Sequence, residues 1–373
     1  MAAYAFVILM PLLLGALIYR ARDMQLLVGD RAIPFGAPLR NRVFLIAAFT
    51  VLMFVSVFRA ERMGTDYSVY LRYYRDDLEW YNANEPLFKW ILRASNAVFH
   101  GEAAGLALVV TGVYFIGVAS LLLDNVGGWE LFFCVMIFVL NPYMYMLITF
   151  NAMRQALATG IILLGVRFIR DSKWIVFTLF ILIAAQIHYT LLSLLALLPL
   201  LLIPWNRVVH FIVAGAAFLF SAFVMDLRLL MDKLSFIPGS FLLGWGEGTK
   251  FDFLLYKIFI LIVAIAVLRW YDRLYTSRRE KFFVDLFLLS LCLLQLAVKN
   301  DSLYRVYSIV STAALPAAAI LMRGVGRISP RVRRWLPIPV LGYYALKMAL
   351  FFATLQSNAS HLTDWQPFAF IWM

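Results

Sequence analysis

Ten apolar runs follow one another along this chain, and each is close to the length that a helix needs to cross a bilayer. A helix requires about 20 mostly apolar residues to span the hydrocarbon core. Hydrophobic residues make up 64% of the chain and charged residues only 14%, which argues against a soluble domain. We therefore expect an all-α polytopic membrane protein in which residues 1–373 form a single integral membrane domain. The runs cover residues 2–19, 43–58, 103–123, 130–149, 152–170, 208–225, 253–271, 282–298, 303–322 and 335–353.

An eleventh apolar stretch, from Trp174 to Ile203, is too long for one crossing and short for two. The basic residues decide between these options, because Lys and Arg gather in cytoplasmic loops. Four basic clusters lie within residues 20–42, 167–173, 273–281 and 323–334. Only two crossings, or a re-entrant pair, keep all four on one face. We expect a short helical hairpin that turns near His188, about twelve transmembrane segments, and both termini outside.

The formal charge of +12 lies mainly in these clusters between apolar runs, so we expect membrane orientation and no nucleic-acid binding. Cys134 and Cys292 each lie within an apolar run and do not form a metal-binding motif. His100, His210 and His361 lack polar neighbours like those of His188. Three further charged residues fall near helix ends and are expected to reach the membrane interface: Lys257, Asp285 and Lys347.

The same topology places two longer loops outside, at residues 59–102 and 226–252. The first contains Asp66, Tyr70, Arg75 and Glu85, and from Pro86 onward its pattern suits a helix lying in the membrane interface. Aromatic rings and carboxylates together suit sugar binding, although an aromatic belt at the lipid boundary explains single Tyr and Trp residues equally well. The second loop is rich in glycine, which suggests a mobile lid.

Polar and ionisable residues also occur inside or beside the apolar runs: Asn151, Arg154, Gln155, His188 and Arg305. A guanidinium at the centre of a bilayer costs roughly 2.5 to 3.5 kcal/mol, so such groups usually face a polar cavity. Asn151, Arg154 and Gln155 are three and four residues apart and are expected to share a helix face. Helix starts near Asn151 and Asp301 would favour a bound anion. Alternatively, each arginine snorkels or pairs with a carboxylate for packing.

Five short motifs, taken in order, resemble the EpsG-like branch of Wzy-type polysaccharide polymerases. The resemblance implies a bacterial inner-membrane enzyme of O-antigen or exopolysaccharide biosynthesis. Such an enzyme transfers a growing glycan from undecaprenyl diphosphate to a hydroxyl of a new lipid-linked repeat unit on the periplasmic side. It also implies a flippase and a chain-length regulator as pathway partners. The motifs are Gly64-Thr-Asp-Tyr-Ser-Val-Tyr70, Glu85-Pro86, Asn151-Ala-Met-Arg-Gln155, Gln186-Ile-His-Tyr-Thr190 and Leu303-Tyr-Arg-Val-Tyr307.

This chemistry makes demands that particular residues can meet. Arginines stabilise a leaving diphosphate through charge-assisted hydrogen bonds, and Arg154 and Arg305 are the candidates. The acceptor hydroxyl needs a general base, for which His188 is suited; Asp66 and Glu85 are alternatives. Arg154, His188 and Arg305 are therefore expected to converge in one wet pocket open to the periplasm. No metal-ligand spacing is present, so we expect metal-independent chemistry without a cofactor. The expected substrate-binding residues are Asp66, Tyr70, Arg75, Glu85, Asn151, Gln155, Tyr189 and Tyr304.

Two other kinds of function remain open. One is a related glycosyltransferase, either an O-antigen-ligase-like enzyme or one that uses a lipid-phosphate sugar as donor. The other is a transporter of lipid-linked oligosaccharides, for which repeated halves or helices broken within the bilayer are typical. The sequence contains no convincing repeat, but the expected hairpin near His188 is compatible with a broken helix.

Overall fold

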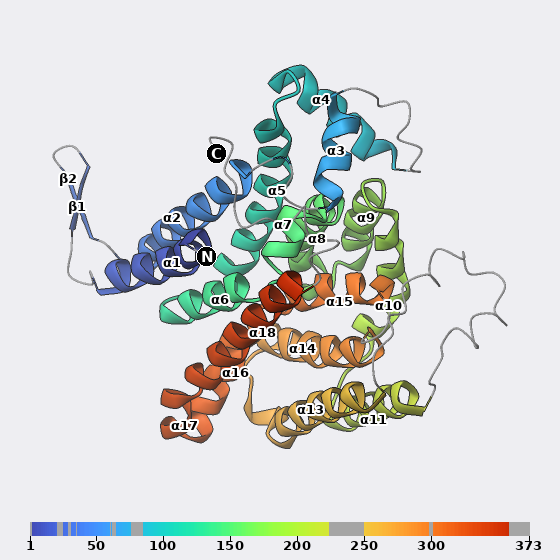
Figure 1. Ribbon diagram of the computed structural model, residues 1–373. Helices are drawn as coiled ribbons and strands as arrows, with labels where there is room; N and C mark the ends of the chain where they lie inside the picture. Colours follow the sequence, from blue (N-terminus) through green and yellow to red (C-terminus); the bar gives the residue numbers. More distant parts are fainter. Residues whose placement is uncertain are drawn as a thin grey trace. The chain divides into compact units, whose positions relative to one another are not determined.

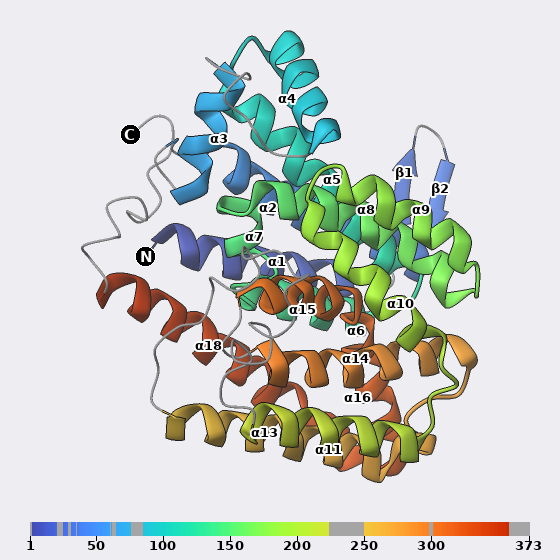
Figure 2. The ribbon, with the colours of Figure 1, turned by 90° about the vertical axis from the view of Figure 1, so that its right-hand side faces the viewer.

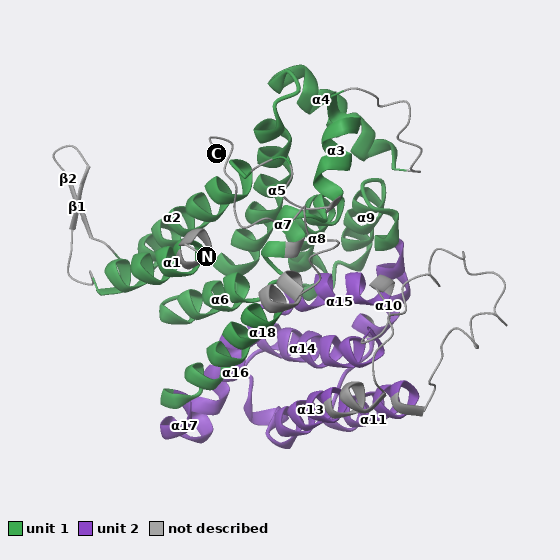
Figure 3. Ribbon diagram, in the orientation of Figure 1, with its two compact units in different colours: residues 1–191, 334–373 green, residues 192–333 purple. Residues whose placement is uncertain are grey.

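The fold is known from a computed structural model that describes residues 2–20, 25–28, 31–34, 36–59, 61, 65–75, 85–223, 250–297 and 301–357. The chain divides into two compact units (Figure 3), residues 1–191 with 334–373 and residues 192–333. Apart from a short β1–β2 hairpin, Gln25–Val28 with Arg31–Pro34, the regular structure of the described residues is helical. This confirms the expected helical architecture.

Unit 1, residues 1–191 with 334–373, contains the N-terminal helices and returns to the last helix of the chain (Figures 1 and 2). Its helices are α1 (Ala2–Arg20), α2 (Ala37–Val57), α3 (Thr65–Arg75), α4 (Pro86–Phe99), α5 (Ala103–Leu123), α6 (Trp129–Leu140), α7 (Met146–Phe150), α8 (Met153–Arg170), α9 (Trp174–Ala185) and α18 (Pro337–Ser357). A 3₁₀ turn, η1 (Tyr189–Leu192), follows α9 at the boundary of the unit.

Unit 2 covers residues 192–333 and packs α14 against α11, α15 and α16. Its described elements are α10 (Ser193–Leu202), α11 (Arg207–Phe223), α13 (Lys250–Arg269), the 3₁₀ turn η3 (Tyr271–Arg273), α14 (Arg278–Ala297), α15 (Asp301–Ala313), α16 (Pro316–Ile328) and α17 (Pro330–Trp335, whose last two residues belong to unit 1).

Every expected apolar run coincides with a helix, but two runs expected to be continuous are broken. The run 130–149 ends as a helix at Leu140, and the run 303–322 is interrupted between α15 and α16, which bend by 54°. A proline lies at each break: at Pro142 it disfavours helical geometry in the residue before it, and at Pro316 it removes a backbone hydrogen-bond donor. Asn141 before Pro142 is extended, and Pro316 begins α16.

The stretch from Trp174 to Ile203 forms two short helices, α9 and α10, as the basic clusters predicted. The expectation of about twelve crossings is not established. Of the helices that the structure describes, α2 and α5 are individually long and apolar enough to span a membrane, and the bent pair α15–α16 adds a third candidate. Several apolar helices are shorter, among them α6, α9 and Tyr189–Leu201.

Two glycines allow α5 and α8 to pack closely in unit 1. A Cβ atom added to Gly117 would lie 2.5 Å from the carbonyl oxygen of Gly160. A Cβ atom added to Gly160 would lie 2.7 Å from the carbonyl oxygen of Val113. Small residues are the usual means by which apolar helices approach one another in membranes. The position of the first turn of α8 therefore depends on this crossing.

The two helices run in the same direction, and polar contacts mark both ends. At their starts, α3 contacts both, because Tyr67 Oη donates to the carbonyl of Ala103 at 3.1 Å and Tyr70 Oη accepts from Arg154 at 2.9 Å. At their far ends, Arg170 Nη1 donates to Asn125 Oδ1 at 2.7 Å. Unit 1 thus has an α3 end and an Arg170 end.

Candidate functional site

Glu85 is the centre of a polar cluster at the α3 end of unit 1. Its side chain is 0% exposed, and Oε2 accepts a hydrogen bond from Arg154 Nη1 at 2.5 Å. Its other oxygen, Oε1, accepts from the backbone N–H of Tyr189 at 3.1 Å and lies 3.4 Å from His188 Nδ1. One carboxylate therefore joins the two groups that the sequence singled out, Arg154 and His188.

Glu85 is held in place because it immediately precedes α4. Pro86 starts that helix, and the backbone N–H groups of Leu87 and Phe88 donate to the carbonyl of Gln186 at 3.2 and 3.3 Å. Backbone N–H groups in the first turn of a helix have no hydrogen-bond acceptor within that helix, so these two bond to Gln186 instead. The start of α4 is therefore fixed to the end of α9, next to His188.

Arg154 lies in the first turn of α8 and bonds to two different segments. Besides Glu85, it donates from Nε to the hydroxyl of Tyr70 on α3 at 2.9 Å, and its side chain is 26% exposed. Burial raises the pKa of Tyr70, while the nearby guanidinium of Arg154 opposes that change. Tyr70 therefore stays protonated at neutral pH and accepts the bond as a neutral phenol. Arg154 combines a buried anchoring side with an edge that solvent reaches.

Asn151 occupies a different position from the one expected. It lies in the break between α7 and α8, so it does not share a helix face with Arg154 and Gln155, and that expectation was wrong because α8 begins only at Met153. Asn151 Oδ1 instead accepts the backbone N–H of Asp66 at 2.8 Å, which caps the start of α3. The Asp66 side chain is exposed, and Gln155 is buried at 6% exposure.

Arg75 holds α3 to the rest of unit 1. Its guanidinium donates to both carboxylate oxygens of Glu61 at 2.7 and 2.5 Å, and its Nε donates to the carbonyl of Gly101 at 2.9 Å. The hydrogen bonds from Arg75 lower the pKa of Glu61, and the same contact raises the pKa of Arg75. Arg75 thus anchors α3 in this structure, and its expected role in substrate binding stays a prediction.

Arg59 was not among the candidate site residues, yet it is fully buried against Tyr67 of α3, the helix that also carries Tyr70. Its guanidinium carbon lies 3.7 Å from the centre of the Tyr67 ring and 5.3 Å from that of Phe150. Nη1 donates to the Ser56 carbonyl, while Nε and Nη2 have no hydrogen-bond partner among the described residues. Burial lowers the pKa of Arg59. The sequence signal was an arginine directly after the apolar run 43–58.

Arg305 and Tyr304 lie on α15 in unit 2, and Asp301 begins that helix as expected. Arg305 is exposed, and the Tyr304 ring lies 5.3 Å from that of Tyr307. The convergence of Arg305 with Arg154 and His188 stays a prediction. Most of the second external loop, residues 226–249, lies outside the described residues, and so does the glycine-rich segment expected to act as a lid.

A second polar cluster lies in unit 2 and was not expected. His210 Nε2 lies 2.8 Å from Asp285 Oδ1, Tyr271 Oη donates to the same oxygen, and Lys281 Nζ lies 2.7 Å from Oδ2. Burial and the bond to Asp285 raise the pKa of Tyr271. Asp285 was expected to reach the membrane interface, but it instead joins α11, η3 and α14. His210, which had no notable neighbours in sequence, stacks on Trp205 at 4.4 Å.

The described residues contain no group of three or more His, Cys, Asp or Glu side chains placed to hold a metal ion. The Glu85 cluster brings together one carboxylate, one guanidinium, one imidazole and one phenol, from Glu85, Arg154, His188 and Tyr70. Such a set can bind an anion, orient an imidazole and accept a proton.

Comparison with models of protein families identifies the family to which this chain belongs. The model of the EpsG family matches residues 42–369, nearly the whole chain. The chain belongs to the EpsG family. No curated protein and no solved structure matches it. EpsG is a Wzy-like polysaccharide polymerase family, so the resemblance found in the sequence is confirmed. Membership implies a membrane protein with polymerase-type glycosyltransferase activity.

Proposed function

We propose that this EpsG-family protein is a Wzy-type polymerase of the bacterial inner membrane. It transfers a growing glycan from undecaprenyl diphosphate to a hydroxyl of a new lipid-linked repeat unit. The observation that carries the proposal is the contact of Glu85 with both Arg154 and His188 at the α3 end of unit 1. These are an anion-binding group and a proton acceptor, the two groups that such a transfer requires.

The distribution of charge supports a periplasmic site. The Arg170 end of unit 1 carries cations at the start of α2, the end of α8 and the turn before α9: Arg40, Arg42, Arg167, Arg170 and Lys173. Lys and Arg residues mark cytoplasmic ends of membrane helices. The Glu85 cluster lies at the opposite end and therefore faces the periplasm.

In the proposed reaction, the acceptor hydroxyl oxygen attacks the anomeric carbon of the growing glycan. The bond between that carbon and the carrier diphosphate breaks, and the bonding electrons leave with the diphosphate. Arg154 binds the leaving anion, joined by Arg305, through charge-assisted hydrogen bonds. His188 takes the hydroxyl proton.

Glu85 is a positioning residue in this scheme. A carboxylate next to one imidazole nitrogen fixes the tautomer, leaving the other nitrogen as the base, and stabilises the imidazolium that forms. Glu85 Oε1 lies 3.4 Å from His188 Nδ1, a separation at which the carboxylate would stabilise the imidazolium through its charge and would hydrogen-bond Nδ1 after a small shift. Because Arg154 already bonds one Glu85 oxygen, the carboxylate is poorly placed to serve as the base itself.

Side chains around the cluster would bind the sugars. Asp66 is exposed at the first turn of α3, Tyr189 is 41% exposed beside His188, and Tyr70 bonds Arg154. Carboxylates bind sugar hydroxyls, and aromatic rings pack on the apolar faces of sugars. The expected sugar contacts of Asn151, Gln155 and Tyr304 stay predictions, since Gln155 is 6% exposed and Tyr304 lies on α15 in unit 2. A flippase that delivers repeat units and a chain-length regulator are the expected pathway partners.

The test is a reconstituted reaction. Purified protein in lipid vesicles is given one synthetic undecaprenyl-diphosphate-linked repeat unit, and the products are sized on a gel with and without EDTA. A ladder that persists in EDTA is the expected result. Arg154→Ala, His188→Ala and Arg305→Ala should each abolish the ladder. Arg167→Ala, an exposed arginine at the other end of α8, should leave it intact.

Other outcomes point to other functions. If the wild-type protein leaves single repeat units unchanged, the polymerase proposal is wrong. If sugar is instead transferred only when a lipid-phosphate sugar is supplied as donor, and that reaction stops in EDTA, the protein is a metal-dependent glycosyltransferase of that kind. Attachment of glycan to a different acceptor, without a ladder, would indicate a ligase-like enzyme.

One structural observation favours a second candidate, a transporter of lipid-linked oligosaccharides. The pair α15–α16, bent by 54°, is apolar enough to be a broken span or a re-entrant loop, and transporters use broken helices to form binding sites. A transporter would move fluorescent carrier-linked repeat units across the vesicle membrane. Transport that Arg154→Ala abolishes, with no ladder formed, would favour this candidate over the polymerase.

A further inference from the structure

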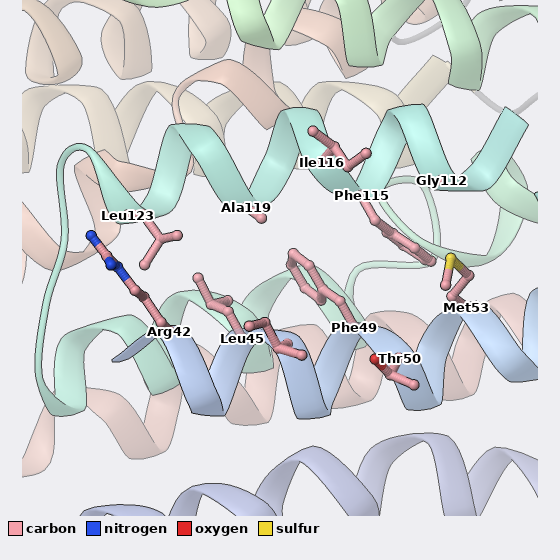
Figure 4. A pocket seen from close by; sticks show the side chains of 11 residues that line it. Arg42, Leu45, Phe49, Thr50, Met53, Gly112, Phe115, Ile116, Ala119 and Leu123 are labelled. Carbon is pink, nitrogen blue, oxygen red and sulfur yellow. The ribbon is translucent and has the colours of Figure 1, made fainter. Parts of the chain in front are cut away.

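An apolar groove of about 420 Å³ lies between α2 and α5 of unit 1 (Figure 4). Arg42 and Thr50 carry its only polar side-chain atoms, and the remaining lining residues are apolar. The volume falls within the range of small-molecule pockets, which is about 300 to 1,000 Å³. Figure 4 shows the lining side chains between the two helices, with Arg42 and Leu123 together at one end.

The groove exists because α5 has small residues where it faces α2. Gly112 and Ala119 are seven positions apart and lie on one side of the helix. A Cβ atom added to Gly112 would meet nothing within 4 Å, so the space beside it is open. The rim is exposed and apolar, since Ile46 is 67% exposed and Ile116 is 61% exposed.

The position of the groove indicates what fills it. Its walls, α2 and α5, are the two described helices that can each span a membrane without a break, so an exposed apolar rim between them faces lipid chains. On α2 it extends from Arg42 to Met53, about 16 Å of helix at 1.5 Å per residue. The hydrocarbon core is about 30 Å thick, so the groove matches one leaflet.

The positive charge of Arg42 indicates which leaflet the groove faces and which type of lipid head group it binds. Arg42 is exposed and forms no ion pair with a carboxylate in the part of the chain that the structure describes. It lies at the Arg170 end of unit 1, away from the Glu85 cluster. An unpaired guanidinium at the mouth of an apolar groove suits a phosphate attached to a lipid chain.

We propose that this groove is a binding site for one anionic phospholipid, with an acyl chain along Phe49 and Gly112 and its phosphate on Arg42. The site is separate from the proposed transfer site, because none of its lining residues belongs to the Glu85 cluster and its charged mouth, Arg42, lies at the other end of unit 1. Phosphatidylglycerol is the probe of choice, since its phosphodiester carries one negative charge and no compensating cation.

Native mass spectrometry tests the proposal. The purified full-length protein is delipidated and exposed to an equal mixture of phosphatidylglycerol and phosphatidylethanolamine of the same chain length. Two variants remove the site in different ways: Arg42→Ala removes the charge, and Gly112→Leu fills the open space. Each has a matched control elsewhere in unit 1, Lys173→Ala at the same cationic end and Gly342→Leu, which also meets nothing within 4 Å.

The wild-type protein and both controls should retain phosphatidylglycerol in preference to phosphatidylethanolamine. Arg42→Ala should weaken that retention about tenfold, the effect of losing one charge-assisted contact, and Gly112→Leu should abolish it. Equal retention of both lipids by the wild-type protein overturns the proposal even if a variant fails to fold. The proposal is also overturned if Arg42→Ala or Gly112→Leu folds and retains phosphatidylglycerol as the wild-type protein does. Displacement of the phospholipid by undecaprenyl phosphate would assign the groove to the carrier and refute the stated occupant.

Discussion

A buried carboxylate loses its contact with water at a cost of several kcal/mol, and at Glu85 the loss is offset by three neighbours. Arg154 supplies the opposite charge, the Tyr189 N–H supplies a dipole, and His188 lies within reach of the same oxygen atom. These partners come from α8 and from the segment after α9. At the residue scale, Glu85 therefore contributes both to stability and to the alignment of the proposed catalytic groups.

Glu85→Gln should remove both contributions while keeping the size of the side chain. Arg154 then loses its counter-charge, and breaking such a buried pair typically costs about 3 to 5 kcal/mol. We expect a clear drop in the thermal midpoint and loss of polymer by at least about a hundredfold, measured by a thermal melt in detergent and by product sizing.

Glu61→Gln is the matched control. Glu61 also pairs with an arginine, but its side chain is 47% exposed and that of Arg75 is 35% exposed, so the change should cost less than about 1 kcal/mol. If the two variants have equal effects on both measurements, Glu85 has no special role.

Some of these residues could be recognised from the sequence because a polar group in an apolar run is costly. Arg154 and His188 were found on that basis. The role of Glu85 as their common partner could not be found, because it depends on contacts between α4, α8 and α9 that have no local pattern. Arg59 was missed since it was counted with the charges of the loop, although it is buried against Tyr67 and Phe150.

At the scale of elements, the crossing of α5 and α8 fixes where Arg154 lies. Gly117→Ala places a methyl group 2.5 Å from the Gly160 carbonyl oxygen and forces the helices apart. Such overpacking typically costs about 1 to 3 kcal/mol. We expect a lower thermal midpoint and weaker polymerisation, since separation of the helices displaces the first turn of α8.

Gly112→Ala on the same helix is its control. Its added methyl group meets nothing within 4 Å, so only the gain in helix propensity, up to about 1 kcal/mol, applies. Gly112→Ala should be neutral or stabilising. A Gly117→Ala protein as stable and active as the Gly112→Ala protein would show that the close approach is unimportant.

Helix positions followed from the apolar runs, and α5 begins and ends at the expected residues, 103 and 123. Interruptions were harder to predict. Pro142 follows the end of α6 and Pro316 begins α16, whereas Pro11 lies within α1, so proline alone does not determine a break. The surrounding residues decide: Asn141 Oδ1 accepts the N–H of Tyr143 at 3.1 Å and stabilises a turn at the first of these breaks.

At the scale of the whole molecule, the orientation in the membrane is the central prediction. The cationic Arg170 end should face the cytoplasm, and the Glu85 end should face the periplasm. Glu102 and Lys173 are exposed at these two ends and suit cysteine labelling, since the native Cys134 and Cys292 are buried. A membrane-impermeant maleimide applied to intact cells should label Glu102→Cys but not Lys173→Cys.

Permeabilised cells provide the control, because both cysteines should then react. The reverse pattern in intact cells would place the Glu85 cluster in the cytosol, where no periplasmic repeat unit reaches it. That result would reject the proposed site orientation while leaving membership of the EpsG family unaffected.

Glu85 is positioned by the helix that follows it, and α4 is only partly enclosed by the rest of unit 1. Trp90 and Val98 on α4 are 64% and 67% exposed, and both are apolar. Lipid headgroups, detergent or a neighbouring protein in contact with that face can therefore shift α4, and a shift of α4 displaces the Glu85 carboxylate at its start. Turnover should respond to the choice of solubilising agent well before the helical bundle melts, so an inactive preparation need not be an unfolded one.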